Sequence, residues 1–311
     1  MKTKYTLLAA ALFLSATACR KTVSDENNGA GPSGLSSNRP VMGVDTTHKP
    51  VVKDTSTLPP PFPVSIPLSG CNLLPIYGDT IIFPQPTSGS DYIFNVVNSP
   101  GTGKYIVWPQ GMVYDSLTGA INVTKSETGM QYVVGFIKDG TTDTCLSTLV
   151  IGGASYMDSV YVLEDGHTKA EPYFDANIYL PSICSQPGNS CTFDVTGSAA
   201  ASKVIMDKTT GIIDLQKTLD GVGLIPIGAF GLLPQNQASF TTRIYYKLND
   251  ASNQALQHID VQFQYFYNKS AISAGVLGGI LNVVNSLTSG HIISNYANPR
   301  PPLIIIVRKG F

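Results

Sequence analysis

The chain has 311 residues, a formal net charge of -1 and only 13% charged residues. With no basic patch or stripe, this composition argues against a nucleic-acid partner. The 29 glycines and 21 prolines, together with many serines, threonines and asparagines, favour short strands and turns over long helices.

Residues 1–18 are predicted to be a signal peptide. A basic start precedes an uncharged run from Thr6 to Ala18, which is shorter than the roughly 20 apolar residues of a membrane-spanning helix. Cys19 follows its small-residue end directly. This arrangement resembles the lipobox of bacterial lipoproteins, although Ala16 stands where that family usually has leucine. The resemblance implies that Cys19 carries a lipid that anchors the chain to a membrane. A secreted protein whose mature chain happens to start with cysteine is the alternative.

Residues 19–66 are expected to form a disordered tether. The segment is poor in aliphatic residues, rich in Ser, Thr, Asn, Gly and Pro, and ends near a run of prolines at 59–63. Ser24-Asp25-Glu26 resembles the acidic export signal of surface lipoproteins in Bacteroidota-type bacteria. That resemblance implies an outer-membrane location on the cell surface. A solvated linker without a signal is the alternative.

Four cysteines remain if Cys19 is lipidated. Cys184 and Cys191 flank a Pro-Gly-Asn turn signal, so the easiest pairing is local and leaves Cys71 with Cys145. The cysteines and the scattered histidines lack the spacing of a zinc site, so no metal and no cofactor is expected.

An internal repeat is the most informative feature of the chain. YDSLTGAINV at 114–123 matches MDKTTGIIDL at 206–215, at an offset of 92 residues. The aspartate can accept hydrogen bonds from backbone amides two or three residues on, and the glycine permits a positive φ, so each copy predicts a tight turn between strands. The turn residues are Asp115, Thr118 and Gly119 in the first copy and Asp207, Thr210 and Gly211 in the second.

This motif resembles the immunoglobulin-like repeats of bacterial surface proteins. Strand-like runs with β-branched or aromatic residues recur from Cys71 onward and are separated by turns, which also favours a β-sandwich. The resemblance implies an all-β chain with one sandwich at 67–154 and another at 155–268. The second copy also carries an insertion around residues 221–234. Residues 269–311 are expected to pack on the second sandwich as a helical or irregular segment, and to end in a strand at Leu303–Val307.

Two groups of side chains are candidates for binding. Aspartates at turns could ligate calcium, but dense acidic clusters are missing and turn capping is the preferred interpretation. An alternating aromatic run places Tyr265 and Tyr267 on one face of a strand and Phe266 on the other. Whichever face is exposed could stack on a sugar.

No motif predicts catalysis, so no catalytic residue is assigned and the chain is not expected to be an enzyme. The leading hypothesis is a lipid-anchored envelope protein that serves in adhesion or envelope assembly with an unidentified protein or glycan partner. The alternative is a glycan-binding accessory lipoprotein of a polysaccharide-uptake system. An exposed aromatic row would favour the glycan-binding role, whereas an exposed apolar patch would favour adhesion.

Overall fold

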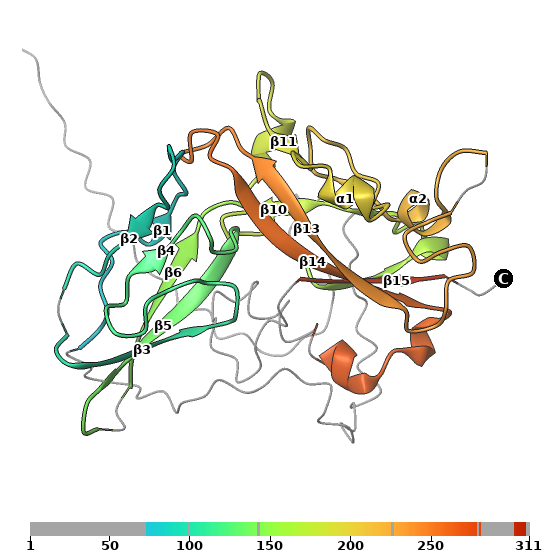
Figure 1. Cartoon of the computed structure of the whole chain (residues 1–311). Helices are drawn as coiled ribbons and strands as arrows, with labels where there is room; N and C mark the ends of the chain where they lie inside the picture. The colour runs from blue at the N-terminus through green and yellow to red at the C-terminus, as the bar shows by residue number, and fades with distance from the viewer. Residues whose placement is uncertain are drawn as a thin grey trace, which may run out of the picture. The chain divides into compact units, whose positions relative to one another are not determined.

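The computed structural model describes residues 73–98, 100–141, 144–224, 227–278, 280 and 302–308. Nearly all of its regular structure is β, which confirms the expected fold class (Figure 1). The predicted signal peptide, Cys19 and the predicted tether lie outside the described residues.

The first sandwich has a four-stranded sheet in the order β1-β6-β5-β3 and a two-stranded sheet, β2-β4. In the large sheet β1 and β6 are parallel, whereas the other neighbours are antiparallel. Side chains from both sheets share one hydrophobic core. The strands are β1 (Ile81–Ile82), β2 (Ile93–Phe94), β3 (Gly103–Trp108), β4 (Ile121–Asn122), β5 (Met130–Lys138) and β6 (Thr144–Ile151).

The second sandwich repeats this plan in a five-stranded sheet ordered β11-β13-β14-β15-β8, with β12-β9 and β10-β7 as two-stranded sheets. Its strands are β7 (Ala154–Tyr156), β8 (Ser159–Val162), β9 (Lys169–Ala170), β10 (Pro172–Phe174), β11 (Thr192–Phe193), β12 (Ile213–Asp214), β13 (Ser239–Lys247), β14 (Gln257–Phe266) and β15 (Leu303–Val307). The α-helices are α1 (Ser198–Ala201) and α2 (Leu215–Asp220), and residues 274–278 are also helical. The 3-10 helices are η2 (Leu163–Asp165), η3 (Ile183–Ser185) and η4 (Lys269–Ala271).

The strand β15 lies inside the five-stranded sheet of the second sandwich. It pairs in parallel with β14 on one side and with β8 on the other. All five of its residues are buried, as expected for a parallel strand covered on both faces. The sequence predicts this strand correctly, but its position between two strands that are far earlier in the chain comes from the structure.

The two Asp-x-x-Thr-Gly segments form the same turn. In each copy the glycine amide donates to the aspartate carbonyl, at 2.8 Å in the first turn and 2.9 Å in the second. Gly119 and Gly211 have φ values of 73° and 75°. A tyrosine hydroxyl from an earlier segment donates to each glycine carbonyl, from Tyr77 at 2.8 Å and from Tyr156 at 2.6 Å. The repeated motif therefore builds the same corner in both sandwiches.

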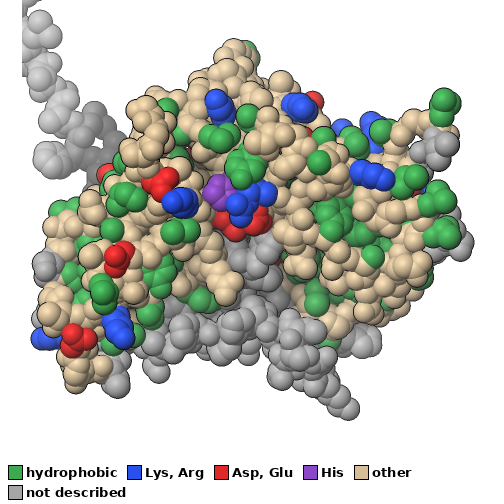
Figure 2. All heavy atoms as spheres, viewed as in Figure 1, with side chains coloured by type: hydrophobic (Ala, Val, Ile, Leu, Met, Phe, Trp, Pro, Cys, Tyr) green, Lys and Arg blue, Asp and Glu red, His purple; other side chains and the backbone are tan. Residues whose placement is uncertain are grey.

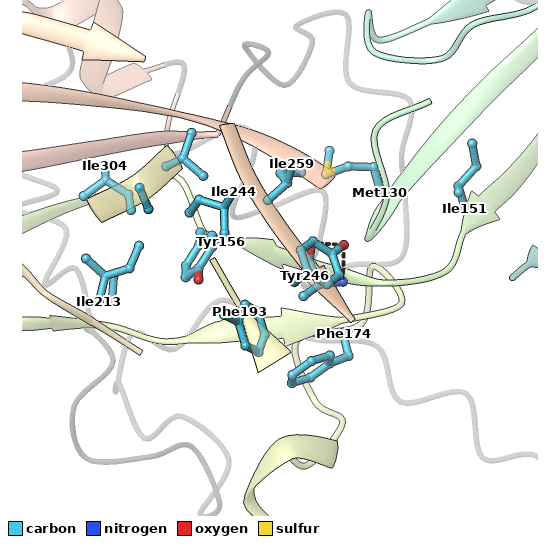
Figure 3. Packing of buried hydrophobic residues seen from close by; sticks show 14 of the residues in the cluster. Met130, Ile151, Tyr156, Phe174, Phe193, Ile213, Ile244, Tyr246, Ile259 and Ile304 are labelled. Carbon is cyan, nitrogen blue, oxygen red and sulfur yellow. Dashed lines mark hydrogen bonds between the residues drawn. The ribbon is translucent and has the colours of Figure 1, made fainter. Parts of the chain in front are cut away.

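The two sandwiches are joined by a continuous hydrophobic core (Figure 3). The fully buried Tyr246 of β13 lies at the junction, where its hydroxyl donates to the Ala154 carbonyl at 2.9 Å and accepts from the Ala154 amide at 2.8 Å. The same hydroxyl contacts the Thr128 hydroxyl. These hydrogen bonds satisfy the Tyr246 hydroxyl, which would be costly to bury without a partner. They connect β13 to Thr128, just before β5, and to Ala154, at the start of β7.

Candidate functional site

The turn aspartates use their carboxylates to cap their own turns. The Asp115 Oδ1 accepts from the amides of Leu117 and Thr118 at 2.7 and 3.0 Å. The Asp207 Oδ1 accepts from the Thr209 hydroxyl at 2.6 Å and from the amides of Thr209 and Thr210 at 2.8 and 2.9 Å. These hydrogen bonds, the Thr209 hydroxyl first, lower the pKa of Asp207 to about 2.

The threonines close the same turns. The Thr118 hydroxyl accepts from the Ala120 amide at 3.3 Å, and the Thr210 hydroxyl accepts from the Ile212 amide at 3.4 Å. Within the described ranges, no three His, Cys, Asp or Glu side chains are grouped so that they could hold a metal ion.

The expected local disulfide between Cys184 and Cys191 is present, with Cα atoms 5.5 Å apart. Cys145 is also disulfide-bonded. Cys71 lies outside the described residues, so the pairing of Cys71 with Cys145 stays a prediction.

The aromatic residues expected to stack on a ligand are mostly inaccessible. Tyr265 is 1% exposed and Phe266 is 3% exposed, because β15 covers one edge of β14 and hydrophobic clusters cover both of its faces. Tyr267 is 37% exposed, but it lies just beyond the strand and its hydroxyl donates to the Pro234 carbonyl at 3.2 Å. The prediction of a stacking row is therefore wrong for Tyr265 and Phe266. Alternation along a strand separates two faces but does not reveal that both are covered.

An exposed apolar surface occurs on the segment between α2 and β13, which we call the apolar loop (residues 221–234). Leu224 is fully exposed, Leu232 and Leu233 are 66% and 72% exposed, and Val222 is 58% exposed. Figure 2 shows hydrophobic side chains on this projecting part of the molecule. The loop coincides with the insertion expected from the repeat.

The base of the apolar loop is held firmly against the second sandwich. The Phe230 ring packs edge-on against Phe240 and lies 5.8 Å from the Tyr265 ring centroid. The Ala229 amide donates to the Thr218 carbonyl at 2.8 Å. Gly228 lies so close to the Leu219 carbonyl that no side chain would fit there. Residues 228–230 are therefore anchored, and the exposed Leu232 and Leu233 follow them closely in the chain.

A cavity of about 670 Å³ lies between the two sandwiches, and we call it the hairpin pocket. One wall is the outer face of the β13–β14 hairpin, with Arg243, Tyr245 and Lys247 at alternate positions of β13 and His258 on β14. The opposite wall comes from the first sandwich, from residues 84–87 after β1 and from 124–125 after β4. Figure 2 shows a histidine beside basic and acidic side chains near the middle of the displayed face.

Charges around the hairpin pocket are largely paired. Arg243 forms a two-pronged ion pair with Asp260, with Nε–Oδ1 at 2.6 Å and Nη2–Oδ2 at 2.9 Å, which raises the pKa of Arg243. Lys125 lies 2.6 Å from the Asp91 carboxylate, and this hydrogen bond lowers the pKa of Asp91. Burial, and then the charge of Arg243, lower the pKa of His258 to about 4, so His258 is neutral at pH 7.

Sequence reasoning missed the hairpin pocket. The alternation of Arg243, Tyr245 and Lys247 is a period-two pattern, which predicts that the three side chains lie on one face of a strand. No sequence signal places Lys125 opposite them, because it comes from the other sandwich.

No family model matches the chain, and no curated protein matches it. The comparison with solved structures found protocadherin and cadherin fragments at low TM-scores. Human protocadherin-24 EC1-2 has 8% identity and a TM-score of 0.19, with 59% of this chain and 91% of that chain covered. PcdhgB3 EC1-4 has 8% identity and a TM-score of 0.18, with 61% and 50% covered. Drosophila N-cadherin EC1-4 has 8% identity and a TM-score of 0.18, with 57% and 46% covered. The chain thus spans about half the length of PcdhgB3 EC1-4 and of Drosophila N-cadherin EC1-4.

Among the described residues, no helix combines the length and the apolar character needed to cross a membrane.

Proposed function

We propose that this chain is a lipid-anchored protein of the bacterial cell envelope that binds another protein, in adhesion or envelope assembly, and catalyses no reaction. The anchor is Cys19, supported by the signal peptide and the lipobox resemblance. The tether at 19–66 holds the two sandwiches away from the outer membrane, on the cell surface.

The observation that carries this proposal is the apolar loop. Soluble monomers rarely keep several large apolar side chains exposed together, and such surfaces mark sites of association. Burying one leucine or valine side chain contributes about 1.5–3 kcal/mol. Four exposed residues on an anchored loop (Val222, Leu224, Leu232 and Leu233) offer a binding surface of useful strength.

The composition of the apolar loop favours a protein partner. Residues 221–238 contain no Asp, Glu, Lys or Arg. A loop without cations has nothing to pair with the phosphates of a lipid headgroup or a nucleic acid, whereas an apolar groove on a protein complements it fully. The partner is therefore expected to present an uncharged apolar surface.

Two of the three residues expected to stack on a sugar, Tyr265 and Phe266, are buried, which weakens the case for the alternative role in polysaccharide uptake. An exposed apolar surface is the feature that separates adhesion from that role.

A photo-crosslinking amino acid in place of Leu224, in the full chain on intact cells, tests the proposal. We expect one discrete crosslinked protein, and we expect Leu233→Glu in the same chain to abolish it. The matched control places the crosslinker at Leu117, which is 69% exposed on a turn of the first sandwich. Crosslinking to lipid only, equal products from both positions, or no product at all would contradict a protein-binding apolar loop.

Anchoring is tested separately by Cys19→Ser. This variant should move from the membrane fraction to the soluble fraction, since it has lost its lipid attachment point. Continued extraction by detergent alone would show that Cys19 is not the anchor.

A further inference from the structure

Hydrogen bonds join the two walls of the hairpin pocket. Gln85 of the first sandwich donates to the Ala251 carbonyl at 3.0 Å, and its side-chain oxygen accepts from the Asn253 amide group at 3.1 Å. Both partners belong to the turn between β13 and β14. The Tyr246 hydrogen bonds to Ala154 hold the same hairpin from its inner face. A site whose walls are already in place loses little ordering entropy when it binds a ligand.

Counting only the described residues, one basic side chain of the pocket, that of Lys247, has no ion-pair partner. Of its three basic side chains, Arg243 is paired with Asp260 and Lys125 is paired with Asp91. Within the part of the chain that the structure describes, no carboxylate lies within ion-pair distance of Lys247. Three positive and two negative charges leave a surplus of one, which matches a ligand with a single negative charge.

The remaining lining is neutral and combines polar side chains with apolar ones (Pro84, Pro86, Ala255 and Leu256). Tyr245 is half-buried, and its ring centroid lies 5.7 Å from that of His258. Because His258 is buried, the exposed part of this aromatic pair is the Tyr245 ring with its phenol hydroxyl. Thr87 and Gln254 add a hydroxyl and an amide. Hydroxyls, amides and a flat ring together are the groups that recognise a sugar ring, which has both apolar C–H faces and hydroxyls at its rim.

We propose that the hairpin pocket binds an acidic sugar, a carbohydrate with one carboxylate per recognised unit, whose carboxylate pairs with Lys247 and whose ring packs on Tyr245. The proposal does not depend on protein binding by the apolar loop, because the two surfaces share no residue. A phosphate dianion is a poorer match to a surplus of one positive charge, and a neutral sugar leaves Lys247 unpaired.

Calorimetric titration of the full chain with oligosaccharides containing glucuronic or galacturonic acid, and with their neutral glucose or galactose counterparts, tests this site. We expect the acidic sugars to bind at least tenfold more tightly than the neutral ones, with an affinity that falls as salt is added. Lys247→Gln should weaken acidic-sugar binding about tenfold or more and should not affect the melting temperature. Tyr245→Ala should weaken acidic and neutral sugars alike.

The matched control is Lys208→Gln, which removes an exposed lysine of the second sandwich outside the pocket and should leave the affinity unchanged. The proposal is wrong if no acidic sugar binds at millimolar concentration or if Lys247→Gln binds as tightly as the parent chain. If inorganic phosphate or a glutamate-rich peptide competes as well as the acidic sugar, the pocket binds anions in general. That result would also contradict the proposal.

Discussion

The two sandwiches have the same strand order except for one strand. In the first, β1 pairs directly with β6, and β6, β5 and β3 follow. In the second, β8 and β14 occupy the corresponding places, but β15 lies between them. The first copy shows that this plan closes without an extra strand. The second shows that the same arrangement also accepts an extra strand, because β15 pairs in parallel with both β14 and β8.

The inserted strand changes how the second sandwich is stabilised. Ile304 and Ile306 point into the core shared by both sandwiches, whereas Leu303, Ile305 and Val307 join a second cluster with Val160 and Phe266. The wider sheet therefore has apolar contacts on both faces. Removing a buried side chain from β15 should consequently cost more than removing an apolar side chain from a short strand of the first sandwich.

Ile305→Ala should have the largest effect. Ile305 is fully buried, so truncation should lower the free energy of unfolding by about 3 kcal/mol, within the usual range of about 2–5 kcal/mol for such changes. Ile93→Ala in β2 is the control, because Ile93 is 45% exposed, and it should cost less than 1 kcal/mol, which is about the contribution of one buried CH₂. Denaturant unfolding measures both. Equal, small losses would mean that β15 only covers a sandwich that is already stable.

The turn glycines should show an intermediate effect that is similar in both sandwiches. A Cβ at Gly119 would lie 2.6 Å from the Tyr105 ring, and a Cβ at Gly211 would lie 2.6 Å from the Phe193 ring. Each alanine variant should therefore cost about 2 kcal/mol, from the positive φ and the ring contact together.

Gly140→Ala separates the two contributions in the glycine experiment. Gly140 also has a positive φ, of 77°, but a Cβ there would meet no atom within 4 Å. Its alanine variant should cost about 1 kcal/mol from the backbone alone. If the three alanine variants lower the melting temperature equally, the contacts of the two turn glycines with the aromatic rings contribute nothing to stability.

The turn aspartates should show the smallest effect, and here the two copies should differ. Asp207→Ala should cost about 1 kcal/mol, because three hydrogen bonds to its carboxylate are lost. Asp115→Ala should cost less, since Leu117 has no hydroxyl to match that of Thr209. Thermal melting at pH 7 of the two variants and the parent chain measures this difference.

Melting at lower pH sharpens the same comparison. The pKa of Asp207 is lowered from 3.8 to about 2, so its stabilising contribution is complete above pH 3.8 and is lost as the pH falls through 2. The difference in melting temperature between the parent chain and Asp207→Ala should therefore become smaller as the pH falls from 3.8 through 2. Calcium should not shift either melt, because these carboxylates cap turns, and a rise of many degrees on adding calcium would revive the metal interpretation.

The features that sequence alone determined are local. Asp, Thr and Gly at fixed spacing encode each corner through hydrogen bonds and a positive φ that span five residues, so the repeat could be recognised without any fold. The local disulfide is of the same kind, since Cys184 and Cys191 are joined across one short turn. Strand-forming composition determined the β class, because β-branched and aromatic residues favour a pleated, half-buried surface.

The features that only the tertiary structure decided are pairings between distant segments. The sequence predicts a strand at Leu303–Val307. Only the folded sheet shows that its neighbours are β14 and β8. Alternation along β14 marks two faces, yet only the packed structure shows that Phe266 is covered as completely as Tyr265. The hairpin pocket likewise exists because the Tyr246 and Gln85 hydrogen bonds bring two sandwiches together, and no periodicity within either sandwich encodes that contact.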